Sequence, residues 1–291
     1  MKYGIYYAYW ERQWGADYIP FVERVSSLGF DILEISCAGI SETSKEKISE
    51  LRSAAEYYGI TLTAGYGPKA SENIASSDLS VRQNAFKFWA DTFPVLYGLG
   101  ITTVGGGLYS YWPVDYSKPI DKPAELHRSI ESMRTLSYMA EKYGIFLHME
   151  VLNRFEGFLL NTAAEGVEYV KAVDRPNVKV MLDTFHMNIE EDSITQAIRK
   201  TGSLLGRLHI GEANRRLPGQ GERVPWYAIG KELKAIGYEG DVVMEPFVLQ
   251  GGQVGSDIKV WRDLSNSATI EQLDQQAKKS LEFIKYIFES E

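Results

Sequence analysis

Residues 178–211 read VKVMLDTFHMNIEEDSITQAIRKTGSLLGRLHIG, and they contain the clearest indication of the fold class. Short β-rich runs stand at its two ends, Val178–Asp183 and Arg207–Gly211. Between them, Ser193-Ile-Thr-Gln196 has the form of a helix capping box, and Gly202 stands where that helix should end. A strand, a helix and a second strand in this order predict a βαβ unit with parallel strands.

The same alternation of apolar β-rich runs and segments of helical period continues along the whole chain. Eight such units in 291 residues favour one closed (β/α)8 TIM barrel that occupies residues 1–291 as a single catalytic domain. The alternative, an open doubly wound sheet, would normally carry a Gly-rich nucleotide turn after the first strand, but residues 6–14 hold aromatic side chains there. The predicted strands are Tyr3–Ala8, Asp31–Ser36, Ile60–Gly65, Ile101–Gly106, Ile145–Glu150, Val178–Asp183, Arg207–Gly211 and Asp241–Glu245.

Helix boundaries can be read at several points between these strands. Thr43-Ser-Lys-Glu46 and Thr162-Ala-Ala-Glu165 have the form of capping boxes, and Gly59 marks a helix end. Pro94 predicts a kink or an early end in the third helix. The last helix should pack one apolar stripe on the barrel, made of Ile270, Leu273, Ala277, Leu281, Ile284 and Phe288.

Composition and charge narrow the class of protein. A hydrophobic fraction of 44% is enough for one large core, while a net charge of −8 argues against binding nucleic acid. The single cysteine, Cys37, cannot form an internal disulfide, and we expect it to be a small buried side chain. The chain shows no signal sequence and no apolar run long enough to span a membrane, so we expect a cytoplasmic protein.

Four consecutive predicted strands end in residue types that bind metals. Functional side chains of a (β/α)8 barrel project from the carboxyl ends of its strands, so these four should point into one mouth. Three carboxylates and one imidazole suit Mn²⁺, Co²⁺ or Mg²⁺ better than metals that prefer thiolates, although zinc stays open. The predicted ligands are Glu150, Asp183, His209 and Glu245.

Other polar and aromatic residues lie in the loops around the same mouth. His186 follows Asp183 by three residues and could hydrogen-bond a bound ligand, and Glu156 and Arg215 stand in the loops after the fifth and seventh strands. Aromatic side chains crowd the first and fourth loops, where rings such as Tyr6 and Trp112 would cover the C–H faces of a sugar. By contrast, His148 should face the barrel interior and His127 the surface of a helix.

Several long motifs resemble the ketose 3-epimerase family, and the similarity includes the opening GIYYAYW (4–10) and so spans nearly the whole chain. The motifs are MEVLNRFE (149–156), VMLDTFHMNIEED (180–192), GEANRRLPG (211–219), VMEPF (243–247) and GSDIKVWRD (255–263).

This resemblance implies roles for the residues named above. Glu150, Asp183, His209 and Glu245 would hold one divalent metal per subunit, usually Mn²⁺ or Co²⁺, and Glu150 and Glu245 would also be the catalytic acid/base pair. The residues Glu156, His186 and Arg215 would grip the O1 to O3 end of a free ketohexose. The family also implies a homodimer or homotetramer.

The expected reaction is epimerisation at C3 through a cis-enediolate. The C3 hydrogen is acidic because the C2 carbonyl can take up the charge, and inversion needs a base on each face of C3. Alternatives are an aldose–ketose isomerase on the same barrel, a metal-dependent abasic-site endonuclease and a non-catalytic sugar-binding barrel. Phosphorylated sugars also stay open, because Arg215 and Arg216 follow the seventh strand, where barrels often bind phosphate.

Overall fold

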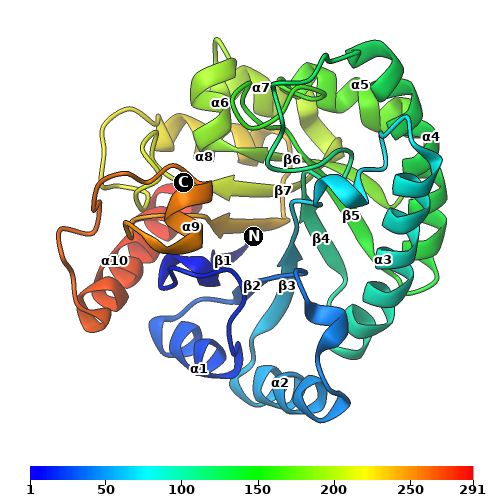
Figure 1. Cartoon of the computed structure of the whole chain (residues 1–291). Coiled ribbons are helices and arrows are strands. Elements are labelled where there is room, and N and C mark those ends of the chain that lie inside the picture. The colour runs from blue at the N-terminus through cyan, green and yellow to red at the C-terminus, as the bar shows by residue number, and fades with distance from the viewer. Residues whose placement is uncertain (291) are drawn as a thin grey trace.

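A computed structural model describes residues 1–290, and its central feature is a closed barrel of eight parallel strands inside a ring of helices (Figure 1). Each strand pairs with the next one along the chain, and β1 pairs with β8 to close the barrel. The predicted TIM barrel is therefore confirmed. Its strands are β1 (Lys2–Tyr6), β2 (Ile32–Ser36), β3 (Thr61–Gly65), β4 (Thr103–Gly106), β5 (Phe146–Glu150), β6 (Val178–Asp183), β7 (Leu205–Ile210) and β8 (Asp241–Met244).

All eight predicted strands are present, and the differences lie at their ends. The first strand stops at Tyr6 because the next residues, Tyr7–Tyr9, form a 3-10 turn, η1. The seventh strand starts two residues earlier than predicted, at Leu205, and the eighth stops at Met244. As a result Glu245 directly follows its strand instead of ending it.

Helices follow the strands and cover the outside of the barrel (Figure 1). They are α1 (Ile19–Leu28), α2 (Lys45–Tyr58), α3 (Leu79–Gly98), α4 (Lys122–Glu141), α5 (Ala163–Val173), α6 (Thr184–Glu190), α7 (Ile194–Thr201), α8 (Trp226–Ala235), α9 (Gly252–Asp257) and α10 (Ile270–Glu289). Short 3-10 turns are η2 (Ile40–Glu42), η3 (Ala70–Glu72) and η4 (Gly202–Leu204).

Most predicted helix boundaries are confirmed, and one is wrong by a residue. The Thr162 side chain accepts a hydrogen bond from the Glu165 amide, and the Glu165 carboxylate accepts one from the Thr162 amide, which completes the capping box. Gly59 ends α2 in a left-handed conformation. The box predicted at Thr43 does not form, because Thr43 ends η2 and Ser44 caps α2 instead.

Pro94 does not end its helix, because α3 continues past it to Gly98. The ring removes one backbone donor, yet the helix is held against the barrel by buried side chains on both sides of the proline. Trp89 and Phe93 before it and Leu96 after it are fully buried. Tertiary packing therefore outweighs the local preference here.

The barrel has two buried compartments of different character. The main hydrophobic core lies between the sheet and the helices, and α10 contributes Leu273, Ala277, Leu281, Ile284 and Phe288 to it, whereas Ile270 at the first turn is exposed. Inside the barrel, side chains such as Glu34, Thr63 and Arg207 are buried and polar. This polar interior leads up to the mouth where the candidate site lies.

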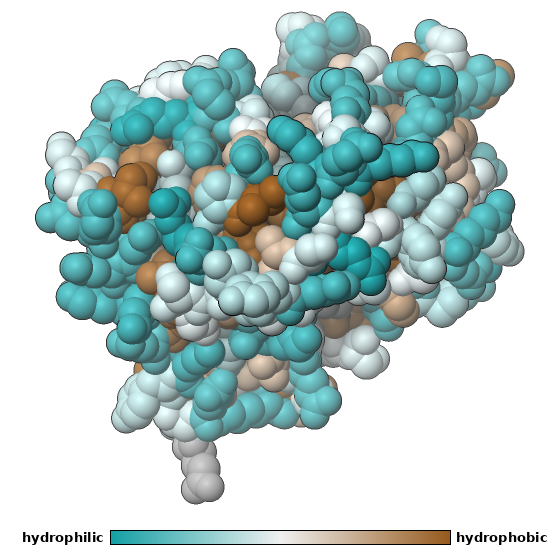
Figure 2. Space-filling model, turned by 90° about the horizontal axis from the view of Figure 1, so that it is seen from below, coloured by the Kyte–Doolittle hydropathy of each residue, from teal (hydrophilic) through white to brown (hydrophobic). Residues whose placement is uncertain are grey.

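The outer surface is mixed in character. On the face shown in Figure 2, hydrophobic residues form separate patches among hydrophilic ones. Among residues 1–290, none of the helices has the length and hydropathy that crossing a lipid bilayer requires.

Candidate active site

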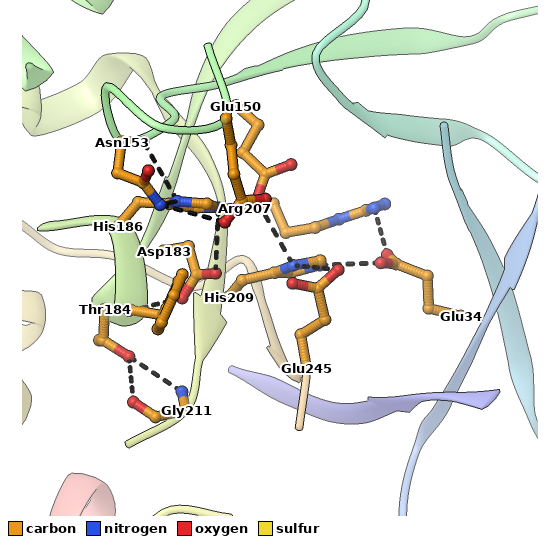
Figure 3. A network of polar contacts seen from close by, with 12 residues as sticks. Glu34, Glu150, Asn153, Asp183, Thr184, His186, Arg207, His209, Gly211 and Glu245 are labelled. Atoms are coloured by element: carbon orange, nitrogen blue, oxygen red, sulfur yellow. Dashed lines mark hydrogen bonds and ion pairs between the residues drawn. The ribbon is translucent and has the colours of Figure 1, made fainter. Parts of the chain in front are cut away.

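Four side chains from the second half of the barrel converge at its carboxyl end (Figure 3). Glu150 and Asp183 are the last residues of β5 and β6, His209 lies one residue before the end of β7, and Glu245 follows β8. Each offers one ligand atom, and these atoms all lie within 4.8 Å of one another. Parallel strands of a barrel place their carboxyl ends on one rim, which is why residues so far apart in sequence meet.

The chemistry of this group fits a divalent cation. Glu150 Oε1 and His209 Nδ1 are buried and have no hydrogen-bond partner among residues 1–290. Burial and the nearby Glu245 carboxylate raise the pKa of Glu150 well above its usual range. Carboxylates packed this closely repel one another, and a bound cation would offset both the repulsion and the cost of burial.

Arg215 lies at the edge of the group formed by Glu150, Asp183, His209 and Glu245, which is called the four-ligand group below. Its Nη1 is 2.9 Å from Glu245 Oε2 and 3.3 Å from Asp183 Oδ2, while Nη2 is 3.3 Å from Glu156 Oε1. The guanidinium also stacks over the Phe185 ring, 3.7 Å from its centre. A planar donor fixed in this way is suited to orienting ligand oxygen atoms beside the carboxylates.

The backbone at Arg215 adopts an uncommon conformation, with φ at 66°. This left-handed region costs a non-glycine residue about 1 kcal/mol. Backbone hydrogen bonds on both sides hold it there: its amide donates to Glu212 O and its carbonyl accepts from Phe247 N, each at 2.9 Å.

His186, on α6, presents a hydrogen-bond donor to the site. Its Nδ1 accepts from the Asn153 amide at 3.1 Å and lies 2.8 Å from Asn153 Nδ2, so Nε2 carries the hydrogen. That Nε2 is 3.7 Å from Glu150 Oε1 and 3.8 Å from Asp183 Oδ2. Burial lowers the pKa of His186, which favours the neutral ring.

A cavity of about 320 Å³ opens above these residues, large enough for a monosaccharide. All five residues predicted to bind substrate line it, together with three of the four predicted metal ligands, while Asp183 is buried beside it. The lining residues from the predictions are Tyr6, Trp112, Glu156, His186, Arg215, Glu150, His209 and Glu245.

Sequence reasoning did not identify three further residues that touch this site. Glu34 of β2 and Arg207 of β7 form a buried ion pair beneath it, and Asn153 orients His186. Although burial raises the pKa of Glu34, the neighbouring Arg207 and His209 side chains lower it to about 2. The sequence did contain a signal for Glu34, because its carboxylate stands inside the β-rich run ILEIS (32–36). A charged group in a buried strand has no water around it and so needs a charged or hydrogen-bonding partner.

The other residues considered for chemistry lie where the sequence placed them. His148 is buried on β5, and His127 is exposed on α4. Cys37 is buried and free, and burial raises the pKa of its thiol above the usual range.

Comparison with known proteins agrees with this geometry. The family model described as xylose isomerase-like TIM barrel matches residues 22–287. The closed barrel and this match place the chain among the xylose isomerase-like TIM barrels.

Individual proteins of known name share more than half of their residues with this chain. The chain is 56% identical over 289 residues to the D-psicose 3-epimerase of Ruminiclostridium cellulolyticum, covering 99% of this chain and 98% of that one. It is 51% identical to the D-psicose 3-epimerase of Agrobacterium fabrum, with 99% of each covered. Crystal structures of D-psicose 3-epimerase with D-tagatose from Clostridium cellulolyticum H10 match with a TM-score of 0.98 at 56% identity, over 99% of both chains.

The chain belongs to the ketose 3-epimerase family, within the xylose isomerase-like TIM barrels. It is therefore an isomerase that acts as an epimerase.

Proposed function

We propose that this chain inverts C3 of free ketohexoses, interconverting D-fructose and D-psicose, with one divalent cation held by Glu150, Asp183, His209 and Glu245. The observation that carries this proposal is the convergence of these four ligand atoms within 4.8 Å at the floor of a monosaccharide-sized cavity. Support for the substrate comes from the relatives of 51–56% identity that are named D-psicose 3-epimerase.

The two glutamates move the proton. Glu150 reaches the cavity from the end of β5 and Glu245 from the end of β8, three strands further around the barrel. One carboxylate takes the C3 proton from one face, the C2 carbonyl receives the charge as an enediolate, and the other carboxylic acid returns a proton to the opposite face. The sugar loses one proton and gains one, which leaves the first glutamate protonated and the second ionised, and proton exchange with water restores both for the next turnover.

Neighbouring side chains hold the substrate and stabilise its charge. The Nε2–H of His186 is positioned to donate to the oxygen on which negative charge develops. Arg215 and Glu156, which are 3.3 Å apart, offer a donor and an acceptor for the hydroxyl groups near C1 to C3. A divalent cation, when bound, supplies Lewis-acid polarisation of the carbonyl, and Mn²⁺ or Co²⁺ suits this ligand set.

The test is a product analysis in heavy water. Chelator-treated protein is supplied with Mn²⁺ or Co²⁺ and incubated with D-fructose in D₂O, and the sugars are separated and examined by NMR. We expect D-psicose with deuterium at C3, and no product from the Glu245→Gln variant. Accumulation of an aldose with deuterium at C2 would replace the proposal by an aldose–ketose isomerase, and no conversion with either metal would contradict it.

A further inference from the structure

Beneath the four-ligand group, the barrel interior contains a buried carboxylate that contacts one of the proposed ligands. Glu34 Oε1 lies 2.8 Å from His209 Nε2 (Figure 3). Both side chains are at most 2% exposed, and neither of these two atoms has a hydrogen-bond partner among residues 1–290, so this ion-pair contact meets no hydrogen-bonding competitor at either atom. Glu34 and the proposed ligands thus form a chain of contacts running from inside the barrel to its mouth.

A second buried residue fixes this carboxylate in place. Arg207 Nη1 donates to Glu34 Oε2 and, at 3.1 Å, to the Ala64 carbonyl, while Nη2 donates to Thr103. Thr63 Oγ1 donates to the same Glu34 oxygen at 3.1 Å. Glu34 is therefore held by Thr63 of β3 and Arg207 of β7, and Arg207 is fixed in turn by Ala64 of β3 and Thr103 of β4, which leaves Glu34 little freedom to turn.

The buried ion pair between Glu34 and Arg207 is not explained by a gain in folding stability. Barrel interiors are usually filled by branched apolar side chains, and burying a charged pair costs desolvation that the attraction barely repays. Arg207 is fully buried, and Glu34 is 1% exposed at its side chain. Apolar residues of similar volume would fill the space at no greater cost, so the pair points to a role at the site above it.

We propose that Glu34 is a positioning residue that sets which nitrogen of His209 faces the cation, and that Arg207 holds Glu34 in the orientation this requires. The inference rests on the proposed function, because it assumes that His209 is a metal ligand.

The Glu34 carboxylate can set the tautomer of His209 because the carboxylate can only accept a hydrogen bond and the imidazole can donate one. A carboxylate paired with a guanidinium only accepts, so His209 Nε2 at 2.8 Å must carry a hydrogen. A neutral imidazole has one N–H, so the lone pair then belongs to Nδ1. That nitrogen lies 3.7 Å from Glu245 Oε1 and 4.0 Å from Glu150 Oε1, on the side of the other proposed ligands. Carboxylates that orient metal-binding histidines in this way typically contribute 10- to 100-fold to metal affinity.

The first experiment measures metal affinity directly. Chelator-treated full-length protein is titrated with Mn²⁺ by calorimetry, for the wild type and for Glu34→Gln. A glutamine keeps the shape of the side chain, but its amide can donate to Nε2 and so favour the wrong tautomer. We expect Mn²⁺ to bind about 10- to 100-fold more weakly in Glu34→Gln.

Glu232→Gln is the matched control. Glu232 is also a buried glutamate, 7% exposed, and forms a two-pronged pair with Arg199 between α7 and α8, away from the cavity. The variant loses the same charge and a pair with an arginine, although Arg199 itself is 69% exposed, so we expect its Mn²⁺ affinity to match that of the wild type. Equal affinity in Glu34→Gln and the wild type, or an equal loss in the Glu232→Gln control, would overturn the role of Glu34.

A second measurement needs no variant of Glu34 that might fail to fold. Wild-type protein labelled with ¹⁵N at its four histidines is loaded with Mg²⁺, which is diamagnetic, and its ring nitrogens are observed by NMR. We expect the His209 ring to carry its proton on Nε2, and a proton on Nδ1 would overturn the inference. A wild-type protein that binds neither Mn²⁺ nor Mg²⁺ would instead overturn the proposed metal centre, so the two failures are distinguishable.

Discussion

The two halves of the barrel mouth are built by the same strand geometry but carry opposite chemistry. The ends of β5 to β8 bring in charged or ionisable side chains, namely Glu150, Asp183, His209 and Glu245. The ends of β1 to β4 and the loops after them bring in aromatic rings and glycines, among them Tyr6, Gly65, Tyr66, Gly106 and Trp112. One half is suited to hold a cation and move protons, and the other to shape the wall against which a sugar ring or chain lies.

Glu34 is a charged residue that the first half of the barrel contributes to the second. It lies on β2, in the apolar half, yet its carboxylate crosses the interior to contact His209 and Arg207 of β7. A residue of β2 therefore contacts His209 from inside the barrel. The division into a charged half and an aromatic half applies to the barrel mouth and not to the barrel interior.

The sharpest test of the charged half is treatment with a chelator, which would remove the proposed cation. Treatment with a chelator should abolish epimerase activity and lower the stability of the protein, because the clustered carboxylates lose the charge that offsets their repulsion. Addition of Mn²⁺ at about one hundred times its Kd should restore about 2.7 kcal/mol of unfolding free energy. Activity is measured with D-fructose and stability by urea unfolding. Full activity in the presence of chelator would show that the β5–β8 half of the mouth does not work through a bound cation.

Substitution of either glutamate is expected to have the next largest effect. Glu150→Gln and Glu245→Gln should each reduce kcat by at least about 10²- to 10⁴-fold, the usual contribution of a general acid or base. Both assays use excess Mn²⁺, so that weaker metal binding does not account for the loss. Circular dichroism provides the check that each variant is folded, and near-normal turnover in either one argues against two bases.

Arg215→Ala should have a smaller effect, on substrate binding. The guanidinium lies between Glu245, Asp183 and Glu156, where it can orient substrate oxygens. Hydrogen bonds to charged groups contribute about 1.5–3 kcal/mol, so kcat/KM for D-fructose should fall about 10- to 100-fold. An unchanged kcat/KM would remove Arg215 from the site.

The smallest effect on activity is expected in the apolar half, at Tyr66. Its hydroxyl donates to the buried carboxylate of Glu72, while the residue lines the cavity. Tyr66→Phe should leave kcat/KM unchanged but cost about 1.5–3 kcal/mol of stability, because the buried Glu72 carboxylate loses one of the two hydrogen bonds to its Oε2 and keeps only that from the Lys69 amide. Tyr66→Ala, which also removes the ring, should reduce kcat/KM. The comparison fails if the loss of the hydroxyl alone reduces activity as much as the loss of the ring.

The elements and the proposed ligands could be predicted because their signals are local. Each proposed ligand stands at the end of a short β-rich run, and in a parallel barrel all such ends lie on one rim. The capping box at Thr162 could be read in the same way, since its two hydrogen bonds span three residues. The box at Thr43 was misplaced because the preceding 3-10 turn, η2, shifts the start of α2 by one residue.

The support beneath the site could not be predicted, because it depends on contacts that cross the barrel. Glu34 and Arg207 are 173 residues apart in sequence and lie on different sides of the interior. A carboxylate in a strand signals only that it needs a partner, and not which residue provides one. The contact between Asn153 and His186 joins the loop after β5 to α6, and its geometry is set by how that loop packs on the helix.

The residue pattern alone was enough to predict that eight strands alternate with helices and that four of them carry a carboxylate or a histidine at or next to their carboxyl ends. The folded structure was needed to show how closely those ends approach, which nitrogen of His209 faces them, and that Glu34 and Arg207 pair inside the barrel. The physical reason is that a side chain's type and its position along a strand are local properties. Distances between strands that are far apart in sequence depend instead on the tilt and stagger with which the barrel closes.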